Sequence, residues 1–262
     1  AEANWTIGVQ GANDRAVAGT LWSTTGTGKI ELGGTWGGTG TDLLGTIDGA
    51  GSGNVVIGET LLAAGDFNIN LSNIAAASGG TLANAVPGTL GWEQANIETN
   101  GNTSTLNTPV SFTGGSKAIN DPGTVLNPTG QTFTHATNQR LLINQGATFQ
   151  NEGTFEFTVN GGQVRSDNGA DGLFLNTNGG LLVSTANNAQ FNRNAADRMF
   201  LQNDPGATIR ATGGGSLILN GTLDERGGTV EAEANSTIRV QGANNRAVAG
   251  TLWSTTGTGK IE

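Results

Sequence analysis

With 262 residues, a formal net charge of −9 and no cysteine, the chain excludes disulfide staples and thiol catalysis, and its acidic balance argues against nucleic acid as a partner. Glycine accounts for 44 residues, whereas charged residues make up 13% and aromatic residues 5%, which is unlike an ordinary globular domain. No apolar run approaches the roughly 20 residues that a helix needs to cross a bilayer, so no membrane span is expected.

The chain begins with a segment that returns at its end. Residues 1–31 and 232–262 align at an offset of 231 positions, and they differ at three of 31 positions: Trp5 against Ser236, Gly8 against Arg239, and Asp14 against Asn245. Self-similarity at a fixed period is the signature of repeat proteins. The chain opens with Ala1 rather than Met and stops within a repeat. We therefore expect a window from a longer tandem array, with residues 1–231 as one full β-solenoid module and residues 232–262 as the start of the next.

The first apolar run of the repeat predicts which residues stack between modules. Ile7 and Val9, like their partners Ile238 and Val240, alternate with polar or small residues. Successive side chains of a strand point to opposite faces, so these four are expected to face inward as the inter-module stacking residues. Arg239 falls on the outer face, where its side chain can extend into water.

The tryptophans of the repeat lead to two different expectations. Replacing a core Trp by Ser would cost about 3–5 kcal/mol, so Trp5, whose counterpart is Ser236, is expected at a corner or at the surface. Trp22 and Trp253 match in both copies and are expected to be buried.

Residues 37–44 read GGTGTDLL and resemble a single calcium-binding RTX nonapeptide. In that family, calcium is shared between successive nonapeptides, which supply carbonyl oxygens and Asp. Only one copy occurs here, so an ordinary glycine-rich turn is the favoured interpretation and no cofactor is expected. If calcium binds, Asp42 and Asp48 are the first candidates.

Three later regions interrupt the rhythm of short runs. Residues 59–92 are rich in Ala and predict a short helix or a loop that leaves the coil. Residues 114–140 contain Pro122 and Pro128 and predict a long loop, and residues 193–200 predict a helical turn. Such excursions are natural places for lateral contacts, although plain variation in coil length explains them equally well.

From residue 141 onward, short runs of alternating apolar residues follow one another, each closed by Gly, Asn, Asp or Pro. Helical periodicity is nearly absent, so many short strands separated by turns are expected. Runs this short fit a parallel β-solenoid, in which each strand stacks on its equivalent one coil away at about 4.8 Å. Gly and Asn tolerate left-handed backbone at the corners, and Asn residues in register can form side-chain ladders.

The segments 207–223, 228–233 and 236–240 repeat the style of Gly-Thr-apolar followed by Gly-Gly-x-apolar. This style resembles the right-handed parallel β-helix of bacterial surface proteins, namely filamentous-haemagglutinin-like adhesins and autotransporter passengers. The resemblance implies an elongated extracellular protein with an adhesive or fibrous role.

Residues that could carry catalysis are few. The single histidine, His135, lies in a Thr-rich segment and is expected to be exposed to solvent, and no G-x-S-x-G motif occurs. Pairs of carboxylates could cleave glycosidic bonds, but such pairs near turns are usually only solvated. The pairs considered are Asp224 with Glu225, Glu231 with Glu233, and Asp167 with Asp171. The sequence therefore predicts no enzyme.

The sequence favours a structural repeat of a giant extracellular or cell-surface fibre, stalk, sheath or matrix protein. Its expected partners are identical modules, with lateral self-association and glycans as further candidates. The main alternative is an adhesin stalk that binds carbohydrate or another cell surface, for which exposed tryptophans would serve as contacts: Trp5, Trp36 and Trp92. A polysaccharide-acting enzyme and an ice-binding solenoid are weaker alternatives, because basic partners and regular Thr ranks are lacking.

Overall fold

The computed structural model describes the chain in segments. The described residues are 6–10, 21–25, 29–33, 46–50, 55–57, 61–62, 67–70, 73–76, 90–92, 96–99, 101–107, 109–167, 171–191, 199–242 and 245–262. Every regular element among them is a β-strand. The chain divides into two compact units, Ala1–Leu126 and Asn127–Glu262, which are treated separately.

The first unit contains short strands that pair with strands from neighbouring coils. Within it, the sheets have the orders β1-β3-β5-β9-β12, β6-β10-β13, β8-β7-β11-β14 and β2-β4. The strands are β1 (Thr6–Gln10), β2 (Leu21–Thr25), β3 (Lys29–Gly33), β4 (Thr46–Ala50), β5 (Val55–Ile57), β6 (Leu61–Leu62), β7 (Phe67–Asn70), β8 (Asn73–Ala76), β9 (Leu90–Trp92), β10 (Ile97–Glu98), β11 (Thr103–Asn107), β12 (Val110–Phe112), β13 (Lys117–Asn120) and β14 (Gly123–Asn127).

The described pairs of this unit are parallel, except for the antiparallel pair of β7 with β8. This pair falls in the region 59–92, where the sequence predicts an excursion from the coil. The excursion therefore contains a hairpin, and its described residues form strands rather than a helix.

The second unit is a regular parallel β-solenoid. Its sheets have the orders β15-β18-β21-β24-β27-β30, β16-β19-β22-β25-β28-β31 and β17-β20-β23-β26-β29. The strands are β15 (Thr132–His135), β16 (Arg140–Ile143), β17 (Ala147–Asn151), β18 (Thr154–Phe157), β19 (Gln163–Arg165), β20 (Gly172–Asn176), β21 (Leu181–Ser184), β22 (Ala189–Phe191), β23 (Met199–Asn203), β24 (Thr208–Ala211), β25 (Ser216–Leu219), β26 (Thr222–Glu225), β27 (Thr229–Ala232), β28 (Thr237–Val240), β29 (Arg246–Ala247), β30 (Leu252–Thr255) and β31 (Lys260–Ile261).

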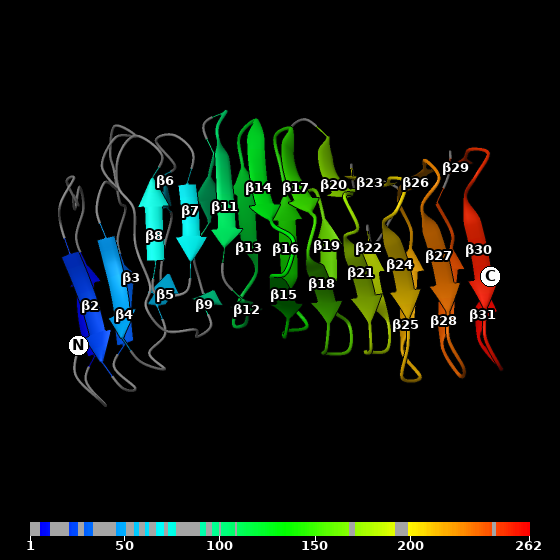
Figure 1. Cartoon of the computed structure of the whole chain (residues 1–262), viewed down its shortest axis with the longest axis horizontal. Helices are drawn as coiled ribbons and strands as arrows, with labels where there is room; N and C mark the ends of the chain where they lie inside the picture. Colours follow the sequence, from blue (N-terminus) through cyan, green and yellow to red (C-terminus); the bar gives the residue numbers. More distant parts are fainter. Residues whose placement is uncertain are drawn as a thin grey trace. The chain divides into compact units, whose positions relative to one another are not determined.

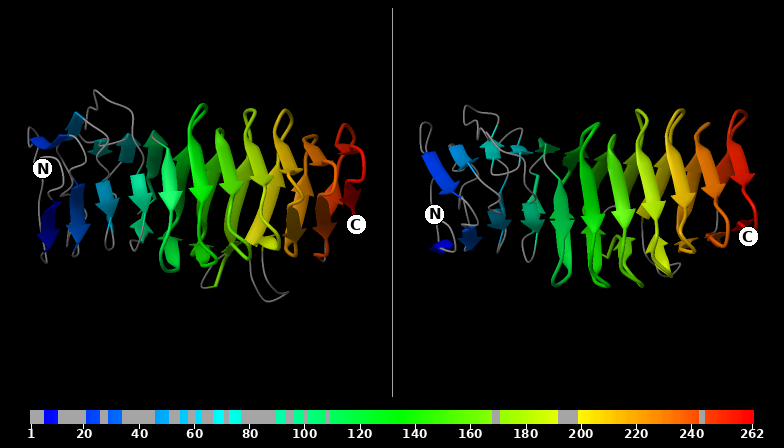
Figure 2. Two further views of the ribbon diagram at one scale, coloured as in Figure 1. Left: turned by 90° about the horizontal axis from the view of Figure 1, so that it is seen from below. Right: turned by 60° about the horizontal axis from the view of Figure 1, so that its bottom comes forward.

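Each coil of this unit contributes one strand to each of the three sheets, as the green-to-red strands of Figure 1 show. The two views of Figure 2 show the turns that carry the chain from one sheet to the next. In the sheet that contains β18, Thr154 pairs with Leu181, Leu181 with Thr208, and Thr208 with Thr229, so coil length varies while the register stays parallel. The predicted fold class, a parallel β-solenoid, is confirmed.

The interior of this unit consists of columns in which one residue stacks on its partner in the next coil. One column reads Phe155, Leu182, Ile209 and Val230, and all four side chains have an exposed fraction of 0%. Aromatic rings fill the first coils. Phe133 stacks on Phe155 with 4.9 Å between ring centroids, and Phe149 stacks on Phe174 at 5.2 Å. Alternation of buried and half-buried residues along each strand produces these columns.

The predicted long loop over residues 114–140 is wrong. Strands β13, β14 and β15 occupy most of this region, and β16 begins at its end. Pro122 lies in the bend between β13 and β14, and Pro128 follows β14 directly. Both prolines stand at corners, where the missing amide hydrogen removes no hydrogen bond from the sheet. The predicted helical turn at 193–200 lies mostly outside the described residues, and its last two residues begin β23.

Candidate functional site: an asparagine ladder

Four asparagines form a hydrogen-bonded ladder inside the second unit. Each is the last residue of its strand and is fully buried: Asn127 of β14, Asn151 of β17, Asn176 of β20 and Asn203 of β23. Each side-chain amide donates to the oxygen of the next asparagine, at 2.7, 2.8 and 2.8 Å between nitrogen and oxygen. The ladder therefore ties together the corners of four successive coils.

The same amide nitrogens also donate to backbone carbonyls at the start of the following strands. Asn151 Nδ2 lies 3.2 Å from the Leu181 oxygen, and Asn176 Nδ2 lies 3.0 Å from the Thr208 oxygen. Buried amide groups cost free energy unless they are paired, and both hydrogens of the Asn127, Asn151 and Asn176 amides find an acceptor here. The ladder is thus consistent with a fixed coil register.

Small residues make room for the ladder. A Cβ atom added to Gly228 would lie 2.2 Å from Asn203 Nδ2, and one added to Gly180 would lie 2.7 Å from Asn176 Oδ1. Both glycines immediately precede a strand. The sequence signal for the ladder is therefore an Asn that ends an apolar run, followed a few residues later by Gly and the next run. Ladders of this kind were expected in general, but the residues that form them were not identified.

A carboxylate occupies the position where the ladder stops. Glu225 ends β26, pairs with Asn203 in the register, and has an exposed fraction of 0%. Burial raises the pKa of Glu225 to about 7, the Asn203 side chain offsets part of this rise, and the charge of Asp224 adds to it. Neither carboxylate oxygen makes a hydrogen bond of good geometry. Glu225 is a site that the sequence did not reveal, because it was expected to be solvated.

Four other acidic residues considered for catalysis lie in ion pairs: Asp167, Asp224, Glu231 and Glu233. Arg210 Nε lies 3.0 Å from Glu231 Oε2 and 3.6 Å from Glu233 Oε1. Asp224 pairs with Arg226 at 2.7 Å, measured from Oδ2 to Nε. Arg165 Nη2 donates to Asp167 Oδ2 at 2.8 Å. These carboxylates therefore link neighbouring residues or coils and do not form acid pairs around a groove.

His135 is a core residue, so its predicted exposure is wrong. It is the last residue of β15, its exposed fraction is 0%, and its ring centroid lies 5.0 Å from that of Phe157. The Nε2 atom lies 3.2 Å from the Gln163 carbonyl oxygen. Thr132 and Thr134 take the outer positions of the strand, whereas His135 takes an inner one. The Thr-rich surroundings of His135 in the sequence therefore do not indicate that its own side chain faces solvent.

Trp92 is also buried, so its predicted role as a surface contact is wrong. Its exposed fraction is 1%, and its ring packs edge-on against Phe112 with 5.7 Å between centroids. The other two proposed contact residues, Trp5 and Trp36, lie outside the described residues. Ser236, the counterpart of Trp5, directly precedes β28 and is buried, and its hydroxyl accepts a hydrogen bond from the Gly214 amide.

Lys117, in the described part of the first unit, is a buried cation. Lys117 has an exposed fraction of 1%, and its ammonium group donates to the carbonyl oxygens of Thr113 and Gly115 and lies 4.0 Å above the Phe112 ring. These contacts satisfy the charge within its own turn, which indicates a structural role.

The calcium candidates are not brought together. Asp42 lies outside the described residues, and Asp48 belongs to β4, where it pairs with Ser23 in the sheet. The described segments contain no group of three or more His, Cys, Asp or Glu residues that could hold a metal ion. The chemistry of the described residues therefore gives no support to a calcium site.

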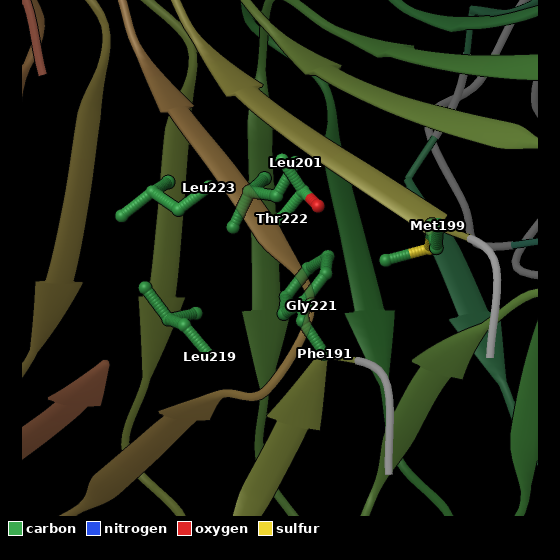
Figure 3. A pocket seen from close by; sticks show the side chains of 7 residues that line it. All are labelled: Phe191, Met199, Leu201, Leu219, Gly221, Thr222 and Leu223. Atoms are coloured by element: carbon green, nitrogen blue, oxygen red, sulfur yellow. The ribbon is translucent and has the colours of Figure 1, made fainter. Parts of the chain in front are cut away.

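A small apolar pocket lies between coils of the second unit (Figure 3). Its lining comes from β22, β23, β25, β26 and the turn before β26: Phe191, Met199, Leu201, Leu219, Gly221, Thr222 and Leu223. The space is too narrow to admit a water molecule, so it is a packing defect and not a ligand site.

One strand pair of the repeated segment, β1 with β3 in the first copy and β28 with β31 in the second, has the same register in both copies. Thr6 pairs with Lys29 in the first copy, and Thr237 pairs with Lys260 in the second, which is the same pair at the offset of 231 positions. Ile238 is fully buried, Val240 is half-buried and Arg239 is exposed. Ile7 and Val9 pair with Ile30 and Leu32.

Two large apolar side chains of the second copy are exposed. Leu252 of β30 has an exposed fraction of 56%, and Trp253 of the same strand has one of 40%, equal to that of Phe200. Trp253 pairs with the fully buried Val230, so it continues an interior column. Trp253 is not buried in this structure, contrary to the prediction.

No family model, no curated protein and no solved structure matches this chain. In the part of the chain that the structure describes, no helix has the length and apolarity needed to cross a membrane.

Proposed function

We propose that this chain is a structural repeat of an extracellular or cell-surface fibre whose modules stack end to end as one continuous β-solenoid. The observation that carries this proposal is the conserved register of the repeated segment. In both copies the first strand pairs with the strand 23 residues later, Thr6 with Lys29 and Thr237 with Lys260. The second copy also pairs backward, because β28 adds to β25.

This arrangement makes module boundaries continuous with the coils on either side. A parallel edge strand presents unpaired backbone groups that favour the addition of another strand. In solenoids each repeat contacts only its neighbours, so length can grow without a new core. The acidic, cysteine-free composition suits a hydrated surface layer, and the resemblance to bacterial surface β-helices supports an extracellular location.

The proposal can be tested with chains of one, two and three tandem modules. At roughly 20–25 residues per coil and about 4.8 Å between coils, each added module extends the rod by about 50 Å. Small-angle scattering should show this constant increment at a fixed cross-section. Electron microscopy of native material should show fibres with the same axial repeat, and surface labelling of intact cells should detect them. Beads of separate compact modules would contradict the proposal.

An adhesin stalk that binds carbohydrate is a second candidate. Trp92 is buried and cannot serve as its glycan contact, but Phe200 of β23 is 40% exposed on the outer face. Exposed aromatic rings can pack on the apolar faces of sugars. A glycan array with the wild type and the Phe200→Ala variant tests this role. The wild type should bind at least one glycan, and the variant should bind it more weakly; no binding, or equal binding, would contradict the role.

A further inference from the structure

Asn-Gly pairs occur at three positions between strands among the described residues of the second unit: residues 160–161, 178–179 and 220–221. In this dipeptide the backbone nitrogen of Gly can attack the side-chain carbonyl carbon of Asn, because Gly carries no side chain to hinder the approach. A cyclic succinimide forms and ammonia leaves, and water then opens the ring to Asp or isoaspartate. The reaction needs only water, so the surroundings of each pair determine which Asn reacts.

The pair at 178–179 forms the tip of the turn between β20 and β21. Asn178 and Gly179 have positive φ angles of 52° and 86°, and the Gly180 amide donates to the Thr177 carbonyl at 2.8 Å, which closes the turn. Both tip residues are exposed, and a Cβ atom built on Gly179 would meet no atom within 4 Å. Among the described residues, no acceptor takes the Gly179 amide hydrogen. The attacking nitrogen is therefore open to solvent.

The other two pairs are more protected. Asn160 is also exposed, but the Gly161 amide donates to the Asn187 carbonyl at 3.0 Å, and Asn160 Oδ1 accepts from the Asn187 amide at 2.8 Å. These two bonds shield the attacking nitrogen and fix the side chain that it would attack. Asn220 and Gly221 are half-buried, and Gly221 lines the narrow apolar pocket between coils. Of the three described pairs, the fold therefore leaves the one at 178–179 free to react.

We propose that Asn178 is a site of spontaneous modification, at which the side-chain amide becomes a carboxylate through a succinimide with Gly179, and that Glu152 turns this change into a repulsion between coils. The bond from Gly179 N to Asn178 Cγ forms while the bond from Cγ to Nδ2 breaks. The Gly179 amide proton goes to a solvent base, and the side-chain nitrogen leaves as ammonia. One water molecule then opens the ring, so the product at position 178 is Asp or isoaspartate. The inference concerns a single chain and does not depend on fibre assembly.

The new carboxylate falls beside an existing one. Asn178 Nδ2 donates to Glu152 Oε1 at 2.6 Å, which joins neighbouring coils at this corner, and Gln150 Nε2 donates to the same oxygen at 2.7 Å. Conversion replaces the donor at 178 with an acceptor of the same charge as Glu152, so an attraction between coils becomes a repulsion. The isoaspartate product also inserts a methylene group into the backbone of the turn. Asn176 keeps its place in the ladder, because it is fully buried and both of its amide hydrogens are bonded.

Ageing of the folded chain tests the site. The full chain is held in mildly alkaline buffer, and conversion at each pair is followed by peptide mass spectrometry with fragmentation. We expect Asn178 to convert several-fold faster than Asn160 and Asn220, and we expect isoaspartate at position 178, detected by labelling with an isoaspartyl methyltransferase.

The same measurement in urea is the matched control, because unfolding exposes three identical dipeptides and their rates should become similar. Similar rates in the folded chain, or faster conversion at Asn160 or Asn220, would overturn the proposal. So would a folded chain in which Asn178 stays intact while the unfolded chain converts.

A double-mutant cycle tests the role of Glu152. Asn178→Asp imitates one product of the conversion, and it should lower the urea midpoint of unfolding of the wild-type chain. In the Glu152→Gln background the same substitution should lower the midpoint less, because the new charge then faces a neutral amide. Added salt should narrow the difference between the two backgrounds. An equal loss in both backgrounds would show that Glu152 does not respond to the modification and would overturn that part of the proposal.

Discussion

Two stretches of the second unit keep the same parallel coils with different stabilising contacts. In residues 127–203, six buried phenylalanines pack face-to-face or edge-on, and the asparagine ladder runs along one corner. In residues 204–262 the interior is aliphatic, the ladder position holds Glu225, and ion pairs join coils on the outside. The backbone register alone therefore does not require a particular interior, provided that each column stays apolar or fully paired.

The connections between strands show where the number of residues per coil can vary. The connection between β23 and β24 covers residues 204–207, whereas β17 and β18, at the same corner, are separated by residues 152–153 only. Strands in both stretches remain short and in register. Extra residues thus enter at one corner without shifting the columns, which allows a solenoid to accept insertions between strands.

The largest expected effect comes from removing an aromatic ring of the first stretch. Phe155 is fully buried and its ring lies within 5.4 Å, centroid to centroid, of Phe133, Phe149 and Phe174. Phe155→Ala should lower the free energy of unfolding by about 3–5 kcal/mol, since it removes the transfer energy of the ring and leaves a cavity. Urea denaturation measures this change. Val230→Ala, in the same column of the second stretch, is the control and should cost roughly 2 kcal/mol. Equal losses would contradict the contrast between the stretches.

Breaking the ladder should have the next largest effect. Asn176→Ala removes bonds to Asn203 and to the Thr208 carbonyl, and it leaves the buried amide of Asn151 without one acceptor. The unsatisfied groups should cost about 2–4 kcal/mol in total. The exposed Asn138 is the matched control, because Asn138→Ala should change stability by less than about 0.5 kcal/mol. A loss of similar size in both variants would show that the ladder adds nothing specific.

Much of the fold could be predicted from the sequence, because alternating apolar runs closed by Gly or Asn require short strands and turns. The ladder could not, since its members come together only through coils of unequal length: Asn151 pairs with Asn176, and Asn176 with Asn203. His135 and Glu225 were expected outside because they are polar. His135 lies two residues after the inward-facing Phe133, and Glu225 lies two residues after the inward-facing Leu223. The alternation of inward and outward residues along a strand therefore predicts their burial better than their polarity does.

Glu225 makes the second stretch sensitive to pH. Its folded-state pKa of about 7 lies above the ordinary value of 4.5, so the unfolded chain releases this proton first as pH rises. Its contribution to stability is therefore fully present below about pH 4.5 and is lost as pH rises through 7. Glu225→Gln removes the charge and should raise the stability at pH 8 by roughly 1–3 kcal/mol relative to the wild type.

The pH profile of unfolding distinguishes this effect from general packing. The Gln variant should lose the decline between about pH 4.5 and 7, and the two proteins should converge in acid. Glu231→Gln is the control, because Glu231 pairs with Arg210 on the outside and its removal should leave the decline in place. A wild-type profile that is flat from pH 4.5 to 8 would exclude a buried, protonated Glu225.

The smallest expected effect is that of the outer ion pairs. Arg210 is about one-third exposed and bridges Glu231 and Glu233, so Arg210→Ala should cost at most about 1 kcal/mol. The salt dependence of the free energy of unfolding shows whether this loss is electrostatic. In 1 M NaCl the screening length falls to about 3 Å, which should remove most of the stability difference between variant and wild type. The cost of Asn176→Ala should persist in the same buffer, because its hydrogen bonds join uncharged, buried groups. A salt-resistant loss at Arg210 would mean that its alkyl chain packs on the coil and that the outer face of the second stretch is held by contact rather than by charge.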